Sequence, residues 1–353
     1  MAVDTGSLPL SLDPLSHLLD RKVAPPEFVI RPFFPRGELT EIVGAHGVFK
    51  STIALAACLS VATGRPWGEV PSSLGRAAFI TLEDGAFTLA RRVGAWFEGV
   101  FDDREQAEAD ARSNLTFLAR ERSQGLVLTR TRDGVTEPRL DVAEHVARLV
   151  AGVDLVVLET ASRIHDGPET NDAFMGLVRS LERVASTGAA VVIVRHVSKK
   201  AAREVTADSY AGRGGSALSD AVRSSLVVTR EPGKALGPVT LTVCKATHAA
   251  PGATLTWHPI EVPDLGAVRL EPWSAEVAAV HDADLLLSFI ATCEGGVVRS
   301  EIHKSPPEGL GRARALAALD LLRSRGALVV REERRGRNRQ PAEVFYTRRP
   351  GRE

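Results

Sequence analysis

Residue types that bind phosphate gather in one short run near the N-terminus, Gly44-Ala45-His46-Gly47-Val48-Phe49-Lys50-Ser51, with Thr52 next. Glycine lets backbone N–H groups turn toward one anion, lysine brings a mobile positive charge, and a serine hydroxyl can ligate Mg²⁺. An apolar stretch over 39–43 precedes the run and a helical pattern over 51–62 follows it, which is the context that a phosphate-binding loop requires. We therefore predict that residues 44–52 bind ATP, that Lys50 contacts the β and γ phosphates, and that Ser51 ligates Mg²⁺.

Phe49 stands where the usual pattern of such loops has its second glycine. A bulky residue is disfavoured there if the loop needs a positive φ, although its N–H group remains available to phosphate. The alternative is a strand, turn and helix that match the pattern by chance. Phe49 weakens the expectation of hydrolysis more than it weakens the expectation of the fold.

Three further polar residues follow predicted strands. Glu83 comes after the strand over 77–82, Glu159 after the strand over 155–158, and His196 after the strand over 190–194. In a parallel sheet these ends meet at the edge that faces the ligand. Phosphoryl transfer needs a carboxylate that activates water and an acid that anchors the metal. We assign these roles to Glu83 and Glu159, and we predict that His196 senses the γ-phosphate; a helix-capping acid, a structural acid and a surface histidine are the respective alternatives.

Composition excludes several other classes of protein. Apolar residues make up 44% of 353 residues, which suits a globular protein of roughly two domains. Lysine plus arginine equals aspartate plus glutamate, so any polyanion must bind to a local patch. Three distant cysteines form no disulfide framework or zinc motif. No apolar run is long enough to span a membrane. We expect a cytoplasmic protein with no membrane partner.

Alternating strand and helix patterns predict an α/β fold with a mostly parallel sheet flanked by helices. A fifth strand is expected over 225–228, and a hairpin over 239–244 and 253–257 is expected to close the sheet. The helical patterns between the strands lie at 51–62, 87–97, 142–150 and 173–185. Residues 1–36 are rich in proline and predict an irregular arm. The ATPase domain is expected over 37–275.

The pattern changes after about residue 273. Helices over 283–292, 299–304 and 312–325 precede two short strands over 327–331 and 343–346, an order typical of a small winged-helix domain, expected over 280–350. Arginines gather on its predicted wing, namely Arg331, Arg334, Arg335, Arg337 and Arg339. They predict a contact to duplex DNA. A solvated face or a protein-docking module is the alternative.

The order of these motifs resembles the RepA-type replicative helicases of plasmids and phages, within the RecA-like P-loop ATPases. The resemblance extends over about 28–259 and is carried by 37–51, 62–67, 82–84, 156–164, 195–199, 213–218 and Arg223. It implies a RecA-like core, in which a phenylalanine before the loop lysine is tolerated. It also implies that Arg223 is an arginine finger offered to a neighbouring subunit, and that Lys50, Ser51, Glu83, Glu159 and His196 have the roles given above.

The same resemblance implies a hexameric ring that threads single-stranded DNA. Two segments, 162–172 and 197–215, would face the channel, and the second carries Lys199, Lys200, Arg203 and Arg213. Such cations bind backbone phosphates with little sequence preference. The leading hypothesis is therefore an ATP-driven, ring-forming DNA translocase or helicase. The alternative is a non-translocating DNA-binding ATPase of repair, recombination or mobile-element regulation.

Overall fold

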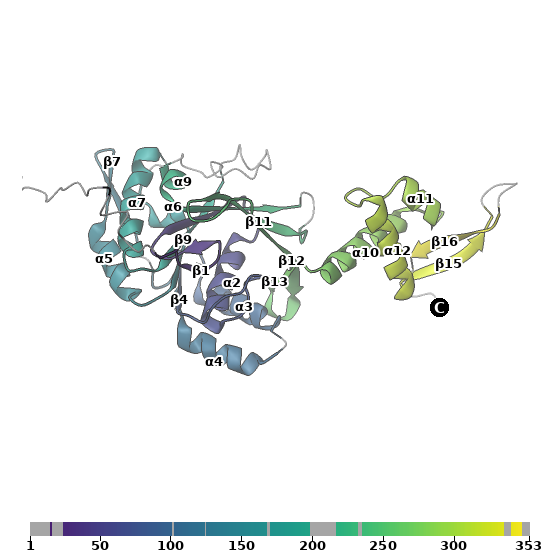
Figure 1. Ribbon diagram of the computed structural model, residues 1–353, viewed down its shortest axis with the longest axis horizontal. Helices are drawn as coiled ribbons and strands as arrows, with labels where there is room; N and C mark the ends of the chain where they lie inside the picture. The colour runs from purple at the N-terminus through teal and green to yellow at the C-terminus, as the bar shows by residue number, and fades with distance from the viewer. Residues whose placement is uncertain are drawn as a thin grey trace, which may run out of the picture.

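A computed structural model describes residues 15, 24–100, 102–123, 125–167, 170–197, 217–231, 235–334 and 340–347 (Figure 1). A large sheet with helices on both faces makes up the N-terminal part, and a smaller group of helices with a hairpin follows it in sequence. None of the described helices combines the length and the apolar character that crossing a membrane requires.

The large sheet has nine strands in the order β13-β12-β11-β10-β3-β9-β8-β4-β5. Its six strands from β10 to β5 are parallel to one another, and β11, β12 and β13 continue it in antiparallel fashion. This confirms the predicted α/β fold with a mostly parallel sheet. The strands are β3 (Leu39–Gly44), β4 (Ala77–Thr81), β5 (Leu115–Leu118), β8 (Leu155–Glu159), β9 (Ala190–His196), β10 (Ser224–Arg230), β11 (Val239–Ala246), β12 (Thr254–Val262) and β13 (Ala267–Pro272).

Alternating residues of the buried strands divide between two hydrophobic cores, because successive side chains of a strand point to opposite faces. In β8, Leu155 and Val157 belong to one core, and Val156 and Leu158 to the other. Helices α2 (Lys50–Thr63), α3 (Ala86–Phe97) and α4 (Arg104–Asn114) pack into the first core. Helices α5 (Leu140–Leu149), α6 (Ala161–Ile164), α7 (Asn171–Ala185) and α9 (Ala217–Ala221) pack into the second.

The structure corrects the expected ends of this unit. The hairpin of β11 and β12 does not close the sheet, because β13 pairs with β12 and forms the edge. The predicted irregular arm contains an antiparallel pair, β1 (Phe28–Ile30) and β2 (Phe34–Pro35). Ile30, Phe33 and Phe34 are buried in the first core, so apolar contacts order the end of the arm. A second hairpin, β6 (Thr129–Arg132) with β7 (Val135–Pro138), also went unpredicted.

The C-terminal elements follow a continuous helix, α10 (Ala275–Thr292), which spans the expected boundary between 275 and 280. Next come β14 (Val297–Val298), α11 (Arg299–Lys304), α12 (Arg312–Ser324), β15 (Leu328–Glu333) and β16 (Ala342–Thr347). The three strands form a separate sheet in the order β14-β16-β15. A hydrophobic core of their own includes Leu286, Ile302, Leu319 and Phe345. Apolar contacts therefore hold these elements together.

A buried ion pair ties the middle of the large sheet together. Glu41 of β3 is 0% exposed and Arg195 of β9 is 2% exposed, and Arg195 Nη1 lies 2.6 Å from Glu41 Oε2. Ser225 of β10 donates to the other oxygen of Glu41 at 2.8 Å, and Arg195 also donates to Ser219 of α9 at 3.2 Å. Each charge therefore has partners that offset its desolvation.

Removing one partner of this pair leaves the other charge buried. We expect Arg195→Met to lower the free energy of unfolding by about 3–5 kcal/mol, because Glu41 then lacks its counter-ion. Chemical denaturation measures the change. The double variant Arg195→Met/Glu41→Gln removes the stranded charge and should recover a large part of the loss. If the single variant loses under about 1 kcal/mol, the magnitude of an exposed pair, the pair does not stabilise the sheet in this way.

Candidate nucleotide-binding site

Lys50 is the first residue of α2 and directly follows the loop that leaves β3. Its side chain is buried, and Nζ donates to the Ala45 carbonyl oxygen at 2.6 Å. Burial lowers the pKa of Lys50 to about 8, while the charges of Glu159 and Glu83 oppose that shift. A buried ammonium at the positive end of a helix is suited to bind an anion, since an anion would offset the favourable hydration that the ammonium loses on burial.

Two glycines fix the path of the loop. A Cβ atom at Gly44 would lie 2.7 Å from the Val228 carbonyl oxygen and 2.9 Å from Val48 Cγ2, so the approach to β10 leaves no room for a side chain. Gly47 has φ +73°, which side-chain-bearing residues rarely adopt. Close packing thus requires a glycine at the start of the loop, and a left-handed backbone favours one at its centre.

Phe49 also adopts the left-handed conformation, with φ 63° and ψ 22°. For a residue with a side chain this conformation costs roughly 1–2 kcal/mol. The ring packs against the first core, and the Arg230 guanidinium carbon lies 6.0 Å from its centroid. Arg230 also donates to the Gly47 carbonyl oxygen at 2.9 Å. Sequence reasoning missed Arg230, although an arginine two residues after the strand expected over 225–228 was an available signal.

Ser51 and Glu159 meet directly, because β8 ends beside the first turn of α2. Ser51 Oγ donates to Glu159 Oε1 in a short hydrogen bond. Glu159 is 1% exposed, and its Oε2 atom has no hydrogen-bond partner in the described part of the chain. Burial raises the pKa of this carboxyl, and Ser51 opposes the shift. An orphaned carboxylate oxygen beside a serine hydroxyl fits Mg²⁺, which prefers oxygen ligands and water.

Glu83 lies just beyond β4, and a threonine holds it there. Thr160 Oγ1 donates to Glu83 Oε1 at 2.9 Å, and Arg163 Nε lies 3.9 Å from the same oxygen. Thr81 Oγ1 accepts from the backbone N–H groups of Glu83 and Asp84, each at 3.1 Å. The carboxylate is therefore held at the ligand-facing edge of the sheet. Sequence reasoning missed Thr160, because its partner follows a different strand.

His196 reaches the loop from the neighbouring strand. It pairs in register with Gly44, and its ring stacks on that of His46 with centroids 4.0 Å apart and planes 18° apart. The strand order thus brings His196 to the phosphate-binding loop, while Thr52 lies in the first turn of α2.

Arg223 lies at the opposite end of the parallel strands from the phosphate-binding loop. It precedes β10, where Ser224 pairs with Thr40 near the start of β3, whereas the loop follows the end of β3. Its Nε atom lies 3.6 Å from Glu38 Oε2, and about half of the side chain is exposed. The structure therefore does not bring Arg223 to the loop of its own chain.

Most of the predicted DNA-binding residues lie outside the described residues: Lys199, Lys200, Arg203, Arg213, Arg335 and Arg337. Arg334 is exposed just after β15. Carboxylates neutralise several arginines on and beside α12, in the pairs Arg299–Asp320, Arg314–Asp282 and Arg323–Glu343. These three arginines lie on the helices and are not among those predicted on the wing.

Comparison with solved structures finds similar chains of low sequence identity. A KaiC-like protein from the archaeon Pyrococcus horikoshii OT3 is 14% identical, with TM-score 0.45, over 70% of this chain and 96% of that one. The RadB recombinase is 16% identical, with TM-score 0.44, over 68% and 93%. A third solved chain, described as an ATPase domain, is 11% identical, with TM-score 0.47, over 66% and 84%.

Comparison of sequences gives a different kind of result. No curated protein matches the chain. A protein family does match it, under the description AAA domain, over residues 9–202, which is more than half of its length and includes the phosphate-binding loop, Glu83, Glu159 and His196. This chain, with its P-loop at the edge of a mostly parallel sheet, belongs to the AAA domain family.

Proposed function

We propose that this chain, a P-loop ATPase of the RecA-like class, is a ring-forming DNA translocase or helicase that hydrolyses ATP between subunits and binds single-stranded DNA. One observation carries the proposal. Lys50, Ser51, Glu83 and Glu159 gather at one edge of the sheet, whereas Arg223 is half exposed at the other edge. A head-to-tail neighbour would bring its Arg223 to the loop, and such contacts form a ring when the rotation between subunits closes.

Each residue of the site has a distinct role in this mechanism. The loop N–H groups and Lys50 bind the phosphates of ATP, and His196 contacts the γ-phosphate. Ser51 and Glu159 would hold Mg²⁺, which neutralises phosphate charge when bound. Glu83, oriented by Thr160, takes a proton from water as the water oxygen bonds to the γ-phosphorus. The bond between that phosphorus and the β–γ bridging oxygen breaks, ADP leaves, and the partner's Arg223 stabilises the charge of the transition state.

DNA binding is proposed at two places. Residues 162–172 and 197–215 would line the channel, with Lys199, Lys200, Arg203 and Arg213 on backbone phosphates. We also propose three regions, an arm over 1–36, an ATPase domain over 37–275 and a winged helix over 280–350. The order helix, strand, helix, helix and hairpin supports the winged helix. Arg334, Arg335 and Arg337 would contact duplex DNA there. A hexameric assembly and a cytoplasmic location belong to the same proposal.

Phe49 favours one alternative, a DNA-binding ATPase of repair, recombination or mobile-element regulation that does not translocate. The strained backbone of its loop would suit slow turnover, and so would Glu159, whose side chain is one methylene longer than that of the aspartate commoner at such a position. Strand displacement by the purified protein would rule this alternative out. Tight sequence-specific binding to duplex DNA without displacement would favour it.

Stimulation by DNA tests the leading proposal. We expect single-stranded DNA to raise the ATPase rate at least about tenfold, since the proposed channel couples DNA to the interfaces. Glu83→Gln should lower the stimulated rate on the order of a hundredfold while nucleotide binding persists, because the water then lacks its base. A steady-state phosphate-release assay measures both rates, and Glu137→Gln on the β6–β7 hairpin is the control. An ATPase rate that single-stranded DNA does not raise would contradict the translocase proposal.

Mixed variants test the site shared between subunits. Arg223→Ala and Lys50→Ala should each lower the ATPase rate on the order of a thousandfold. An equal mixture should recover roughly a quarter of the wild-type rate, because randomly mixed rings pair an intact loop with an intact Arg223 at that share of interfaces. Arg130→Ala, an exposed arginine of the β6–β7 hairpin, is the matched control. A mixture as inactive as either variant alone would show that Arg223 does not act across an interface.

A matched pair of substitutions tests the backbone at Phe49. Both Phe49→Ala and Phe49→Gly delete the ring and its contact with Arg230, but only glycine adopts φ 63° without strain. We expect Phe49→Gly to be more stable than Phe49→Ala by about 1 kcal/mol, measured by chemical denaturation. Equal stability, or a more stable alanine variant, would mean that residue 49 is not left-handed in solution.

A further inference from the structure

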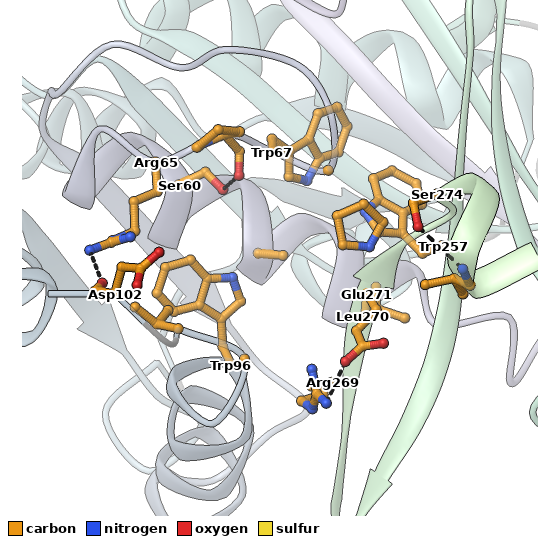
Figure 2. A pocket seen from close by; sticks show the side chains of 17 residues that line it. Ser60, Arg65, Trp67, Trp96, Asp102, Trp257, Arg269, Leu270, Glu271 and Ser274 are labelled. Atoms are coloured by element: carbon orange, nitrogen blue, oxygen red, sulfur yellow. Dashed lines mark hydrogen bonds and ion pairs between the residues drawn. The ribbon is translucent and has the colours of Figure 1, made fainter. Parts of the chain in front are cut away.

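A cavity of about 460 Å³ lies between α2, the end of α3 and strands β12 and β13 (Figure 2). Three of the four tryptophans of the chain line it: Trp67, Trp96 and Trp257. The volume is in the range of pockets that hold small ligands. None of the roles proposed above uses this cavity.

The aromatic walls are fixed in place by the core. Trp67 is 1% exposed and Trp257 is 2% exposed, with ring centroids 5.4 Å apart, and Trp67 Nε1 donates to the Ile53 carbonyl oxygen at 3.2 Å. Trp96, from the last turn of α3, faces the same space from the other side (Figure 2). Its ring packs edge-on against Phe97. Trp67 and Trp257 therefore form a buried floor, and Trp96, which is partly exposed, presents the ring on which a flat, aromatic ligand stacks with little reorganisation.

Polar groups lie at one end of the cavity. Arg65 Nη2 donates to the backbone carbonyl oxygens of Asp102 and Asp103, at 2.6 and 3.2 Å. The Asp102 side chain lies beside this guanidinium and Trp96 (Figure 2). On another wall Arg269 and Glu271 neutralise each other at 2.5 Å. The end near Arg65 therefore offers N–H donors and a carboxylate acceptor side by side.

We propose that this cavity binds the purine base of a nucleoside or nucleotide, as a site separate from the P-loop. A purine has an aromatic face for Trp96 and an edge with both donors and acceptors. Arginine pairs with the O6 and N7 acceptors of guanine, and a carboxylate accepts from base N–H groups. Arg65 and Asp102 supply these two partners together, so guanine is the base that fits them best.

The cavity is also placed to influence the P-loop. Ala56 and Ser60 of α2 line it, about 9 and 15 Å along the helix from Lys50 at its first residue. A base bound in the cavity would thus contact α2, the helix whose first residue lies at the P-loop. By reciprocity, a change in ADP affinity caused by the base would equal the change in base affinity caused by ADP.

Tryptophan fluorescence of the full chain tests the site. With the P-loop saturated by ADP, guanosine should quench the fluorescence saturably, and uridine should bind at least about tenfold more weakly because its smaller ring fills less of the cavity. Asp102→Asn and Arg65→Met should each weaken guanosine at least about tenfold. Asp103→Asn, which changes the neighbouring carboxylate, and Trp273→Phe, outside the cavity, should leave the affinity unchanged.

Three results would overturn the proposal. One is the absence of saturable quenching by guanosine and adenosine up to their solubility limits. Another is quenching that ADP displaces one for one, which would place the nucleoside in the P-loop. The third is an affinity that neither Asp102→Asn nor Arg65→Met changes. Because the titration needs no hydrolysis and no DNA, its result is independent of the translocase proposal.

Discussion

The balance of charge around one buried lysine governs the nucleotide site. The Lys50 ammonium sits at the start of α2 with little access to water, and the nearby carboxylates Glu159 and Glu83 compensate its burial only in part. Burial also disfavours the ionised form of Glu159, so Lys50 and Glu159 both lose favourable hydration. A triphosphate with a divalent cation carries the complementary charges.

The geometry of parallel strands brings these charged groups together. Strands β3, β4, β8 and β9 run in the same direction, so the residues that follow them meet at one edge although they are far apart in sequence. Contacts between those strand ends then fix the side chains: Ser51 bonds to Glu159, and Thr160 bonds to Glu83. A left-handed Phe49 persists in the adjoining loop because its ring packs on the core and Arg230 contacts both the ring and the Gly47 carbonyl.

Local patterns in the sequence determined the fold class and most of its central elements. The run from Gly44 to Ser51 and the acids after buried strands predicted the candidate site. Strand and helix periodicity and the ligand-facing edge of a parallel sheet are properties of short segments and of their order, so they can be read from the sequence. Three elements were not predicted: α4, the β6–β7 hairpin and the edge strand β13. Their apolar residues show weak periodicity, and their formation depends on contacts with neighbouring elements.

Tertiary structure alone decided the partners. The contact of Thr160 with Glu83, the contact of Arg230 with the loop, the neutralised arginines beside α12 and the meeting of three tryptophans around one cavity all join residues distant in sequence. Side-chain contacts of this kind depend on how helices and strands pack in three dimensions, and periodicity along the chain carries no record of them. The sequence thus predicted which residues would bear the chemistry, and packing decided which groups contact them.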